Sequence, residues 1–352
     1  MTDSKAQGRA IGATGRYGLD NRRLQAWLEQ HLPGFKGPLE AEKFPDGQSN
    51  PTYRLRTGAG SYVLRRKPPG QLLASAHAVD REFRVLKALS QTDFPVPKVY
   101  TLCEDDSVIG SMFYVMEHVD GRVFWDQTLP GVTPALRGQM FDSMNATIAT
   151  LHAIDYAAIG LEGFGRVGGF LERQLARWIK QYRASETETI EAMGRLIEWL
   201  PSRIPKDGTT TLVHGDYRMD NVIFHPTEPL VAAVIDWELA TLGDPLVDFA
   251  YHVMAWRIDP ELFRGFAGLD YKALGIPTEE EYVAAYCRRC GRSDIPHLEV
   301  YVVYSMFRIA AILQGVLKRA LDGNASSEEA LDVGRRGRAI AECAWALART
   351  II

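Results

Sequence analysis

Hydrophobic and polar positions change their spacing about a third of the way along the chain. Up to about residue 118, short segments of alternating or apolar residues dominate, and beyond it apolar residues recur every three or four positions. The first pattern is typical of strands and the second of helices. The sequence therefore predicts an α+β protein with a small β-rich first part and a larger, mainly helical second part.

The first part is expected to hold one helix followed by a small sheet. Residues 1–18 are rich in Gly, Ser and charged residues without periodicity, so we expect a flexible tail there. Asp20 is a suitable N-cap for a helix that Gly34 would end. Strands are expected at 52–56, 61–65, 98–102 and 111–117, with a further helix at 74–89. We assign residues 19–118 to this N-terminal lobe.

Helical patterns fill most of residues 119–352, which we assign to a C-terminal lobe. Thr133, with a proline after it, would cap one helix. Ser185 and Thr278 each have a glutamate three positions later, the pattern of a capping box that begins a helix. Strand-like segments interrupt the helices at 211–214, 221–225 and 231–236.

Composition and charge narrow the classes of function. Hydrophobic residues make up 46% and charged residues 24%, which is usual for a soluble globular protein, and the net charge is only −4. Such a balance provides no general attraction for nucleic acid or an anionic membrane, so neither is expected as a partner. The apolar runs are shorter than a membrane span and the first residues lack a secretory signal, so we expect a cytoplasmic protein.

The densest chemical motif surrounds His214, Gly215 and Asp216. Asn221 follows Asp216 by five residues, the spacing of Asp and Asn in the catalytic loop of protein kinases, and Asp236 ends an apolar strand farther along. Phosphoryl transfer uses such a trio, because Mg²⁺ neutralises the nucleotide phosphates while a carboxylate orients the acceptor hydroxyl. Each residue could instead be structural, as a turn cap, the start of a strand or a partner of an arginine.

These motifs resemble those of the aminoglycoside phosphotransferase and choline kinase superfamily. The resemblance is carried by residues 44–55, 62–70, 214–221 and 234–248. It is strongest with bacterial phosphotransferases related to the kinase-like amino-terminal region of fused acyl-CoA dehydrogenases. The resemblance implies a two-lobed, protein-kinase-like fold.

The resemblance also implies roles for individual residues. Asp216 would be the catalytic base, Asn221 and Asp236 would bind Mg²⁺, and Asp248 would brace the loop. We expect Asp220 to be a solvated side chain. For the nucleotide, a turn would contact phosphates, a buried cation would pair with a helix glutamate, and a hinge would hold adenine. The residues in these positions are Gly47, Ser49 and Asn50 in the turn, Arg65 as the cation with Lys67 as the alternative, Glu82, and Met116, Glu117 and Val119 in the hinge.

Three features separate the chain from other classes. Gly215 replaces the arginine of the protein-kinase H-R-D motif and Trp237-Glu238 replaces Phe-Gly, so a small-molecule kinase is favoured over a protein kinase. The G-x-G-x-x-G at 163–168 follows a helical pattern and a loop, which excludes a dinucleotide-binding fingerprint. Cys287 and Cys290 have no second pair nearby and are interpreted as incidental helix cysteines.

The sequence thus predicts an ATP- and Mg²⁺-dependent kinase that phosphorylates a small-molecule hydroxyl. The resemblance implies a hydroxyacyl-CoA acceptor, and aminoglycoside- or choline-type acceptors and a regulatory pseudokinase are the alternatives. An anionic acceptor would suit a basic and aromatic set of residues, unless these only form surface ion pairs. That set is Arg288, Arg289, Arg292, Tyr301, Tyr304, Phe307, Arg308, Lys318 and Arg319. The oligomeric state and the choice between ATP and GTP stay open.

Overall fold

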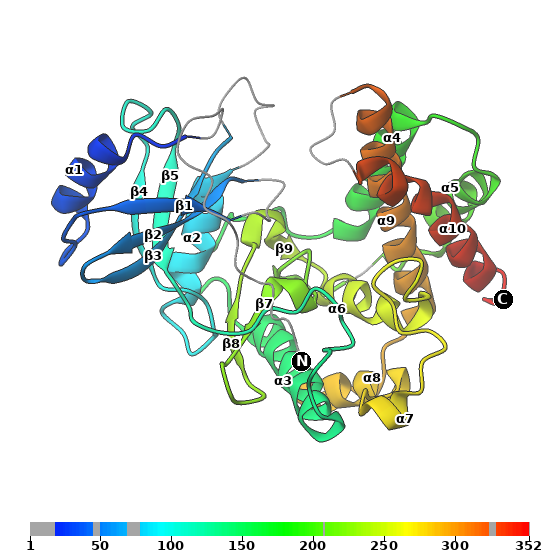
Figure 1. Ribbon diagram of the computed structural model, residues 1–352. Coiled ribbons are helices and arrows are strands. Elements are labelled where there is room, and N and C mark those ends of the chain that lie inside the picture. Colours follow the sequence, from blue (N-terminus) through cyan, green and yellow to red (C-terminus); the bar gives the residue numbers. More distant parts are fainter. Residues whose placement is uncertain (1–17, 45–49, 69–77, 207, 324–328, 352) are drawn as a thin grey trace. The chain divides into compact units, whose positions relative to one another are not determined.

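The computed structural model describes residues 18–44, 50–68, 78–206, 208–323 and 329–351 (Figure 1). Its contacts divide the chain into two units. The first unit comprises the described residues up to Asp120 together with Ala233–Glu238, and the second comprises Gly121–Ala232 and the described residues from Leu239 onward. The predicted tail lies almost wholly outside the described residues.

The first unit is built on a five-stranded antiparallel sheet in the order β1-β2-β3-β5-β4. Its strands are β1 (Glu40–Lys43), β2 (Thr52–Thr57), β3 (Gly60–Arg66), β4 (Val99–Cys103) and β5 (Phe113–Glu117), and its helices are α1 (Asn21–His31) and α2 (Val79–Leu89). Buried residues of α1, including Leu24 and Leu28, pack with Leu55, Leu64 and Phe113 of the sheet. The Asp20 carboxylate caps α1 as predicted, by accepting from two backbone N–H groups.

Strand β1 was not predicted, because its sequence Glu-Ala-Glu-Lys has almost no apolar residues. It is an edge strand that pairs with β2 along its whole length. An ion pair of 2.9 Å between Glu42 and Arg56 joins the two strands. Charged residues are common on edge strands, where alternation of hydrophobicity is a weak signal.

The second unit is mainly helical, with two small two-stranded sheets. Its helices are α3 (Pro134–Ala153), α4 (Phe170–Ser185), α5 (Glu191–Arg203), α6 (Pro245–Val253), α7 (Tyr271–Leu274), α8 (Glu279–Arg289), α9 (Leu298–Leu321) and α10 (Ala330–Ala348). One sheet pairs β6 (Thr211–Val213) with β9 (Thr241–Gly243), and the other pairs β7 (Val222–Phe224) with β8 (Val231–Val234). The last two residues of β8 belong to the first unit.

Helix α9 forms the core of the second unit. By length and composition it could cross a membrane, contrary to the expectation from the apolar runs, but 89% of its most apolar stretch is buried. Figure 1 shows α10 running beside α9. The two approach closely because α10 has glycine at position 334, where a Cβ atom would lie 2.7 Å from Leu317. We therefore interpret the apolar length of α9 as core packing.

Helix capping was predicted correctly at two positions in this unit and wrongly at a third. The Thr133 side chain caps α3, and Thr278 and Glu281 form a reciprocal capping box on α8. Ser185 instead ends α4, where its hydroxyl donates to the carbonyl groups of Gln181 and Tyr182. A serine hydroxyl satisfied by the preceding turn does not begin the next helix.

Candidate active site

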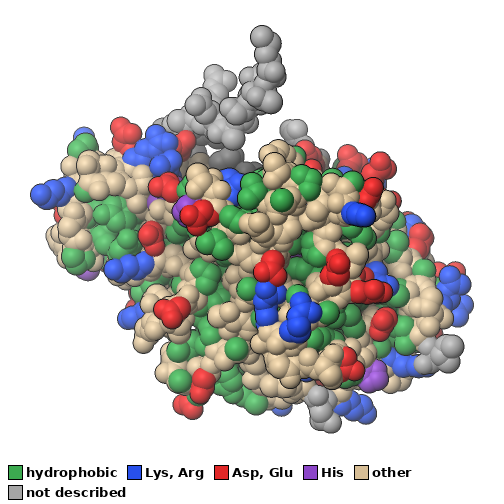
Figure 2. Space-filling view, turned by 90° about the horizontal axis from the view of Figure 1, so that it is seen from below, with side chains coloured by type: hydrophobic (Ala, Val, Ile, Leu, Met, Phe, Trp, Pro, Cys, Tyr) green, Lys and Arg blue, Asp and Glu red, His purple; other side chains and the backbone are tan. Residues whose placement is uncertain are grey.

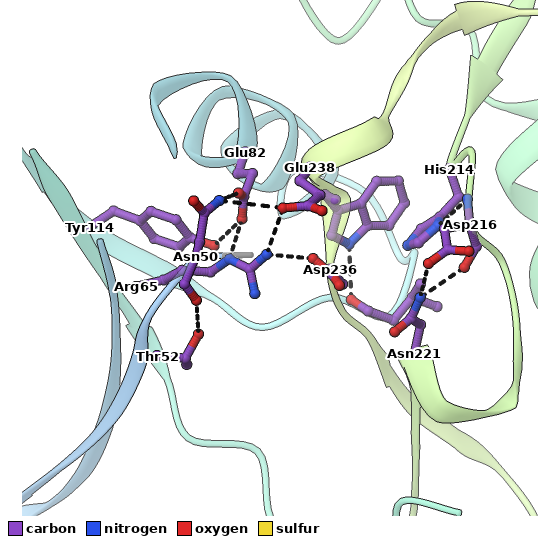
Figure 3. A network of polar contacts seen from close by, with 12 residues as sticks. Asn50, Thr52, Arg65, Glu82, Tyr114, His214, Asp216, Asn221, Asp236 and Glu238 are labelled. Atoms are coloured by element: carbon purple, nitrogen blue, oxygen red, sulfur yellow. Dashed lines mark hydrogen bonds and ion pairs between the residues drawn. The ribbon is translucent and has the colours of Figure 1, made fainter. Parts of the chain in front are cut away.

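The first unit holds a buried guanidinium surrounded by carboxylates (Figure 3). Arg65 lies on β3, and only 11% of its side chain is exposed. Its Nε lies 2.7 Å from a Glu82 carboxylate oxygen, and its Nη2 pairs with Asp236 and lies 3.4 Å from Glu238. Burial alone would lower the pKa of Arg65, but attraction to Glu82 and Asp236 outweighs it, so the pKa is raised.

Glu82 is the centre of the same cluster on the α2 side. Its side chain is 1% exposed, and it accepts hydrogen bonds from Asn50 Nδ2 at 2.6 Å and from the Tyr114 hydroxyl at 3.0 Å. Burial raises the pKa of Glu82 to about 7, although Arg65 opposes the rise. The charge of Glu82 therefore depends on pH near neutrality, and Arg65 is the main group that keeps it ionised.

Asp236 reaches this cluster from a segment distant in the sequence. Residues 233–238 pack with the first unit, through a hydrogen bond from the Val234 N–H to the Pro95 carbonyl at 2.9 Å and an edge contact of Trp237 with Phe94. We expected two lobes that are each continuous in sequence, 19–118 and 119–352. Residues 233–238 instead belong to the first unit, because they make these apolar and ionic contacts with it. Asp236 has φ of +66°, a conformation that costs free energy in residues other than glycine and is concentrated at functional sites.

The other predicted nucleotide residues lie in different surroundings. Gly47 and Ser49 fall outside the described residues. Lys67 is 31% exposed and lies 3.9 Å from Asp80, so Arg65 and not Lys67 belongs to the buried cluster. In the predicted hinge Met116 is buried, Glu117 is exposed and Val119 is half-buried, and the Glu117 N–H donates to the Lys98 carbonyl at 2.8 Å.

The second unit holds the predicted catalytic loop between β6 and β7. Gly215 has φ of +83°, and a Cβ atom there would lie 2.8 Å from the Leu239 carbonyl oxygen, so this turn requires glycine. Asp248 on α6 accepts the His214 and Gly215 N–H groups at 2.7 and 2.8 Å, which confirms its predicted bracing role. Burial opposes its ionisation, but a hydrogen bond from His152 keeps the pKa of Asp248 below its ordinary value.

Asp216 follows this turn and is held by three donors. Its Oδ1 accepts from the Tyr251 hydroxyl at 2.6 Å, and its Oδ2 accepts from Arg218 Nε at 3.1 Å and from Asn221 Nδ2 at 3.0 Å. Figure 3 shows the hydrogen bonds that tie Asn221 to Asp216 within one turn of chain. The loop therefore fixes the orientation of this partly exposed carboxylate.

Two residues contact this loop in a way that was not predicted from the sequence: Tyr251 was not considered, and Arg308 was assigned to the acceptor set. Tyr251 lies three positions after Asp248 on α6, on the same helix face, which is a signal that could have revealed it. Arg308 donates to the Gly215 carbonyl at 2.7 Å and stacks over the Tyr251 ring, so it supports the loop from α9. An isolated arginine in an apolar helix was the available signal, since a buried cation needs a partner.

The predicted basic and aromatic acceptor set does not lie on one surface, because several of its members are buried or paired elsewhere. Tyr301, Tyr304 and Phe307 are core residues of α9 and do not line a surface. Arg308 donates a hydrogen bond to the Gly215 carbonyl of the predicted catalytic loop. Arg289 binds Asp142 and Asn145 at 2.7 and 2.8 Å. Because α9 is surrounded by other helices, its periodicity did not reveal which side chains are accessible.

Asp220 also differs from the prediction of a solvated side chain. It is 2% exposed, and its Oδ2 lies 2.7 Å from Arg264 Nη1 and 3.3 Å from Arg218 Nη1. Its burial is offset by these two guanidinium groups.

The cysteine pair of α8 consists of free thiols, with Cys287 buried and Cys290 half-buried. Burial raises the pKa of both thiols, so both are protonated at neutral pH. In the described ranges, no group of three or more His, Cys, Asp or Glu side chains is placed to hold a metal ion by itself.

Comparison with known proteins places this architecture in a family. The profile of the phosphotransferase enzyme family matches residues 40–287. Mouse (Mus musculus) acyl-CoA dehydrogenase family member 10 is 48% identical over 325 residues, which are 90% of this chain and 30% of that protein. Rat (Rattus norvegicus) acyl-CoA dehydrogenase family member 11 is 44% identical over 340 residues, 94% of this chain and 43% of that protein. The chain thus spans less than half the length of these relatives.

Solved structures agree with the family profile. A Ralstonia eutropha protein provisionally assigned to the aminoglycoside phosphotransferases is 53% identical, with a TM-score of 0.86 over 94% of this chain and 99% of that one. Choline kinase from Cryptosporidium parvum is 12% identical, with a TM-score of 0.60 over 92% and 95% of the two chains, and shares the fold alone. The predicted kinase-like fold is confirmed, and the chain belongs to the phosphotransferase enzyme family.

Proposed function

We propose that the chain transfers the γ-phosphoryl group of ATP, bound with Mg²⁺, to a hydroxyl group of a small molecule. The observation that carries this proposal is the Asp216 carboxylate, partly exposed and held by Tyr251, Arg218 and Asn221 in a loop that a buried aspartate braces. A fixed carboxylate can accept the proton of an acceptor hydroxyl and orient its oxygen toward the phosphorus. Because donors contact both oxygens, the orientation of the Asp216 carboxylate is fixed.

Two side chains fit Mg²⁺ by their chemistry. Asn221 uses its Nδ2 to bind Asp216, and its Oδ1 makes no hydrogen bond within the described residues. Asp236 presents a carboxylate on a strained backbone, and its partner is a cation. A carboxylate and an amide oxygen are hard ligands, and nucleotide phosphates and waters normally complete the octahedron of Mg²⁺. When bound, the ion would neutralise the phosphate charge that develops during transfer.

The first unit is proposed to bind the nucleotide. Arg65 would hold phosphate oxygens, with Glu82 and Asn50 keeping it in place. Since the Glu117 N–H is already used by Lys98, the adenine would contact the Glu117 carbonyl and the Val119 backbone. A structural neighbour of 17% identity, with a TM-score of 0.58, is an aminoglycoside phosphotransferase in a ternary complex with ADP and hygromycin B, which is consistent with nucleotide use in this fold.

The acceptor is proposed to be a hydroxylated acyl-CoA or a related hydroxy acid. Support comes from the curated relatives, in which the matching region is part of a longer protein named as an acyl-CoA dehydrogenase family member. An aminoglycoside acceptor would be a polycation and needs accessible carboxylates. On the face shown in Figure 2, acidic and basic side chains are interspersed among uncharged ones, so that face offers neither a broad acidic nor a broad basic surface.

The test is a screen of acceptors by mass spectrometry. The full chain is incubated with ATP and Mg²⁺ and with hydroxyacyl-CoAs, free hydroxy acids, kanamycin or choline. We expect a mass gain of one phosphoryl group on a hydroxylated acyl compound and none on kanamycin or choline. Phosphoryl transfer to kanamycin alone would contradict the proposed acceptor and indicate an antibiotic-modifying enzyme. Saturable ATP binding without transfer to any acceptor, by both the parent chain and Asp216→Asn, would favour the regulatory pseudokinase.

A further inference from the structure

An open pocket of about 310 Å³, including its mouth, adjoins the catalytic loop within the second unit. Two of its lining residues, Arg218 and Tyr251, hydrogen-bond Asp216. A molecule in this pocket would therefore lie beside the proposed base. The enclosed part of the pocket is small, so it suits a short alkyl segment better than a multi-ring sugar.

The pocket combines an apolar wall with a cationic side. The wall includes Met254, Ala255, Ile258 and Phe263, and the cations are Arg218 and Arg264. No Asp or Glu is among the lining residues. Burial lowers the pKa of His252, another lining residue, to about 4, so it is neutral at physiological pH. The chemistry of the wall fits an alkyl chain, and that of the cations fits an anion.

Arg264 is the more available of the two cations. Its side chain is 30% exposed, and Nη1 is bound to the buried Asp220. Within the described residues its other guanidinium N–H groups make no hydrogen bond. A guanidinium has five N–H donors in a fixed planar fork, so several remain to bind carboxylate or phosphate oxygens.

The position of this guanidinium is fixed from three sides. Asp220 holds one edge, and the rings of Trp125 and Phe263 lie 5.9 and 5.7 Å from its central carbon. The Arg264 backbone has φ of +41°, which a residue other than glycine adopts at a cost. Trp125 is 54% exposed, an unusual position for a large aromatic residue. These features describe a preorganised cation in the lining of a mainly apolar pocket.

We propose that Arg264 determines acceptor specificity by binding an anionic group of the acceptor, while the acceptor's alkyl chain lies on the Met254 and Ile258 wall and its hydroxyl reaches Asp216. This inference rests on the proposed function and adds the residue that selects the substrate class. The anion is a carboxylate in a free hydroxy acid or a phosphate in a CoA thioester. The hydroxyl loses its proton to Asp216 as its oxygen bonds the γ-phosphorus and ADP leaves.

The experiment compares matched acceptors and matched variants. The acceptors are a series of hydroxyalkanoates, their methyl esters, which carry no charge, and their CoA thioesters. The variants are Arg264→Ala, Arg264→Lys, and Arg195→Ala as a control, because Arg195 is an exposed arginine of α5 that pairs with Glu191. Arg264→Lys keeps a charge opposite Asp220 and guards against misfolding, which circular dichroism and thermal unfolding would monitor.

We expect Arg264→Ala to raise KM and Kd for the anionic acceptors roughly 10- to 100-fold, because a charge-assisted hydrogen bond is lost. KM for ATP and for the methyl esters should not change, Arg264→Lys should lie between, and Arg195→Ala should match the parent chain. A loss confined to the free acids identifies the carboxylate as the bound group, and a loss confined to the thioesters identifies the CoA phosphates.

Two results overturn the inference. One is an equal ratio of KM between anion and methyl ester in the parent chain and in Arg264→Ala. The other is the absence of saturable binding of any tested anion to the parent chain. In contrast, Arg264-dependent binding of an anion without any phosphoryl transfer contradicts the proposed function and leaves this binding site intact.

Discussion

Arg65 in the first unit is a cation surrounded by carboxylates, whereas Asp216 in the second unit is a carboxylate surrounded by hydrogen-bond donors. The partners of Arg65 come from α2 and from residues 233–238, far from it in sequence. Two of the three donors to Asp216 lie within five residues of it. One site is assembled by long-range ion pairs, and the other mainly by the local course of the chain.

The difference teaches how each site meets its ligand. The Asp216 oxygens are held by hydrogen bonds before any acceptor arrives, as the proposed base requires. Arg65 is paired with Asp236, which is also the proposed metal ligand. In the proposed complex, nucleotide phosphates bind Arg65 and Mg²⁺ binds Asp236, so the ion pair between these residues would have to separate. Binding of either ligand to its residue would leave the partner residue free for the other ligand. We therefore expect preorganisation in the second unit and ligand exchange in the first.

The largest expected effect tests the preorganised site. Asp216→Asn should lower kcat on the true acceptor by about 10²- to 10⁴-fold, because the base is lost, while ATP binding stays intact. Steady-state kinetics and a calorimetric ATP titration measure the two quantities. Retention of half of the parental kcat would remove Asp216 from this role.

The next effect tests the ion-pair cluster with a pair of neighbouring cations. Arg65→Ala leaves Glu82 buried without its main partner, and we expect a loss of about 3–5 kcal/mol in the free energy of unfolding. Lys67→Ala removes a partly exposed pair and should cost less than about 1 kcal/mol. Denaturant unfolding measures both, and an ATP titration should show weaker binding for Arg65→Ala alone. Equal effects of the two substitutions would contradict the assignment of Arg65 as the buried cation.

A smaller effect concerns ligand exchange at Asp236. In Asp236→Ala the thermal stabilisation by ATP should no longer increase when Mg²⁺ is added. The affinity of this variant for the complex of ATP with Mg²⁺ should fall roughly 10- to 100-fold. Alanine at φ of +66° also adds backbone strain, so Asp236→Gly, which accepts this conformation, is the matched control. Both variants should lose the dependence on Mg²⁺. Recovery of that dependence in Asp236→Gly would assign the effect to the backbone and not to the carboxylate.

The same contrast explains which parts could be predicted from the sequence. Asp216 and Asn221 were recognisable because a fixed spacing identifies a loop with local contacts, whereas the bracing Asp248, 34 residues from His214, was found only through the family resemblance. The contacts of Tyr251 and Arg308 with the loop were not predicted, because they depend on the packing of α6 and α9. Periodicity shows that a helix is buried without showing which element each residue faces.

The acceptor-binding residues were harder still to predict from periodicity. The acceptor was expected beside basic residues of the last helices, but Arg308 contacts the loop and Arg289 binds residues of α3. Arg264 was not considered, since it lies in a loop without regular spacing and its relation to Asp220 depends on the fold. Asp220 was expected in solvent because charged residues are mostly exposed, a rule that fails where a partner is buried with them.

The smallest expected effect is a pH dependence of stability that belongs to the Arg65 cluster and not to the Asp216 loop. Burial raises the pKa of Glu82 to about 7 in the folded protein, above its ordinary value of 4.5. The folded state therefore binds a proton at Glu82 that the unfolded state has lost between these values, so stability falls as pH rises through this window. Relative to Glu82→Gln, which cannot titrate, the parent chain should lose roughly 1–3 kcal/mol in the free energy of unfolding between about pH 5 and pH 8. Denaturant unfolding of both proteins across this range measures the difference. A difference that is constant with pH would show that Arg65 keeps Glu82 ionised throughout, and one that grows in favour of the parent chain at high pH would reverse the sign of the argument.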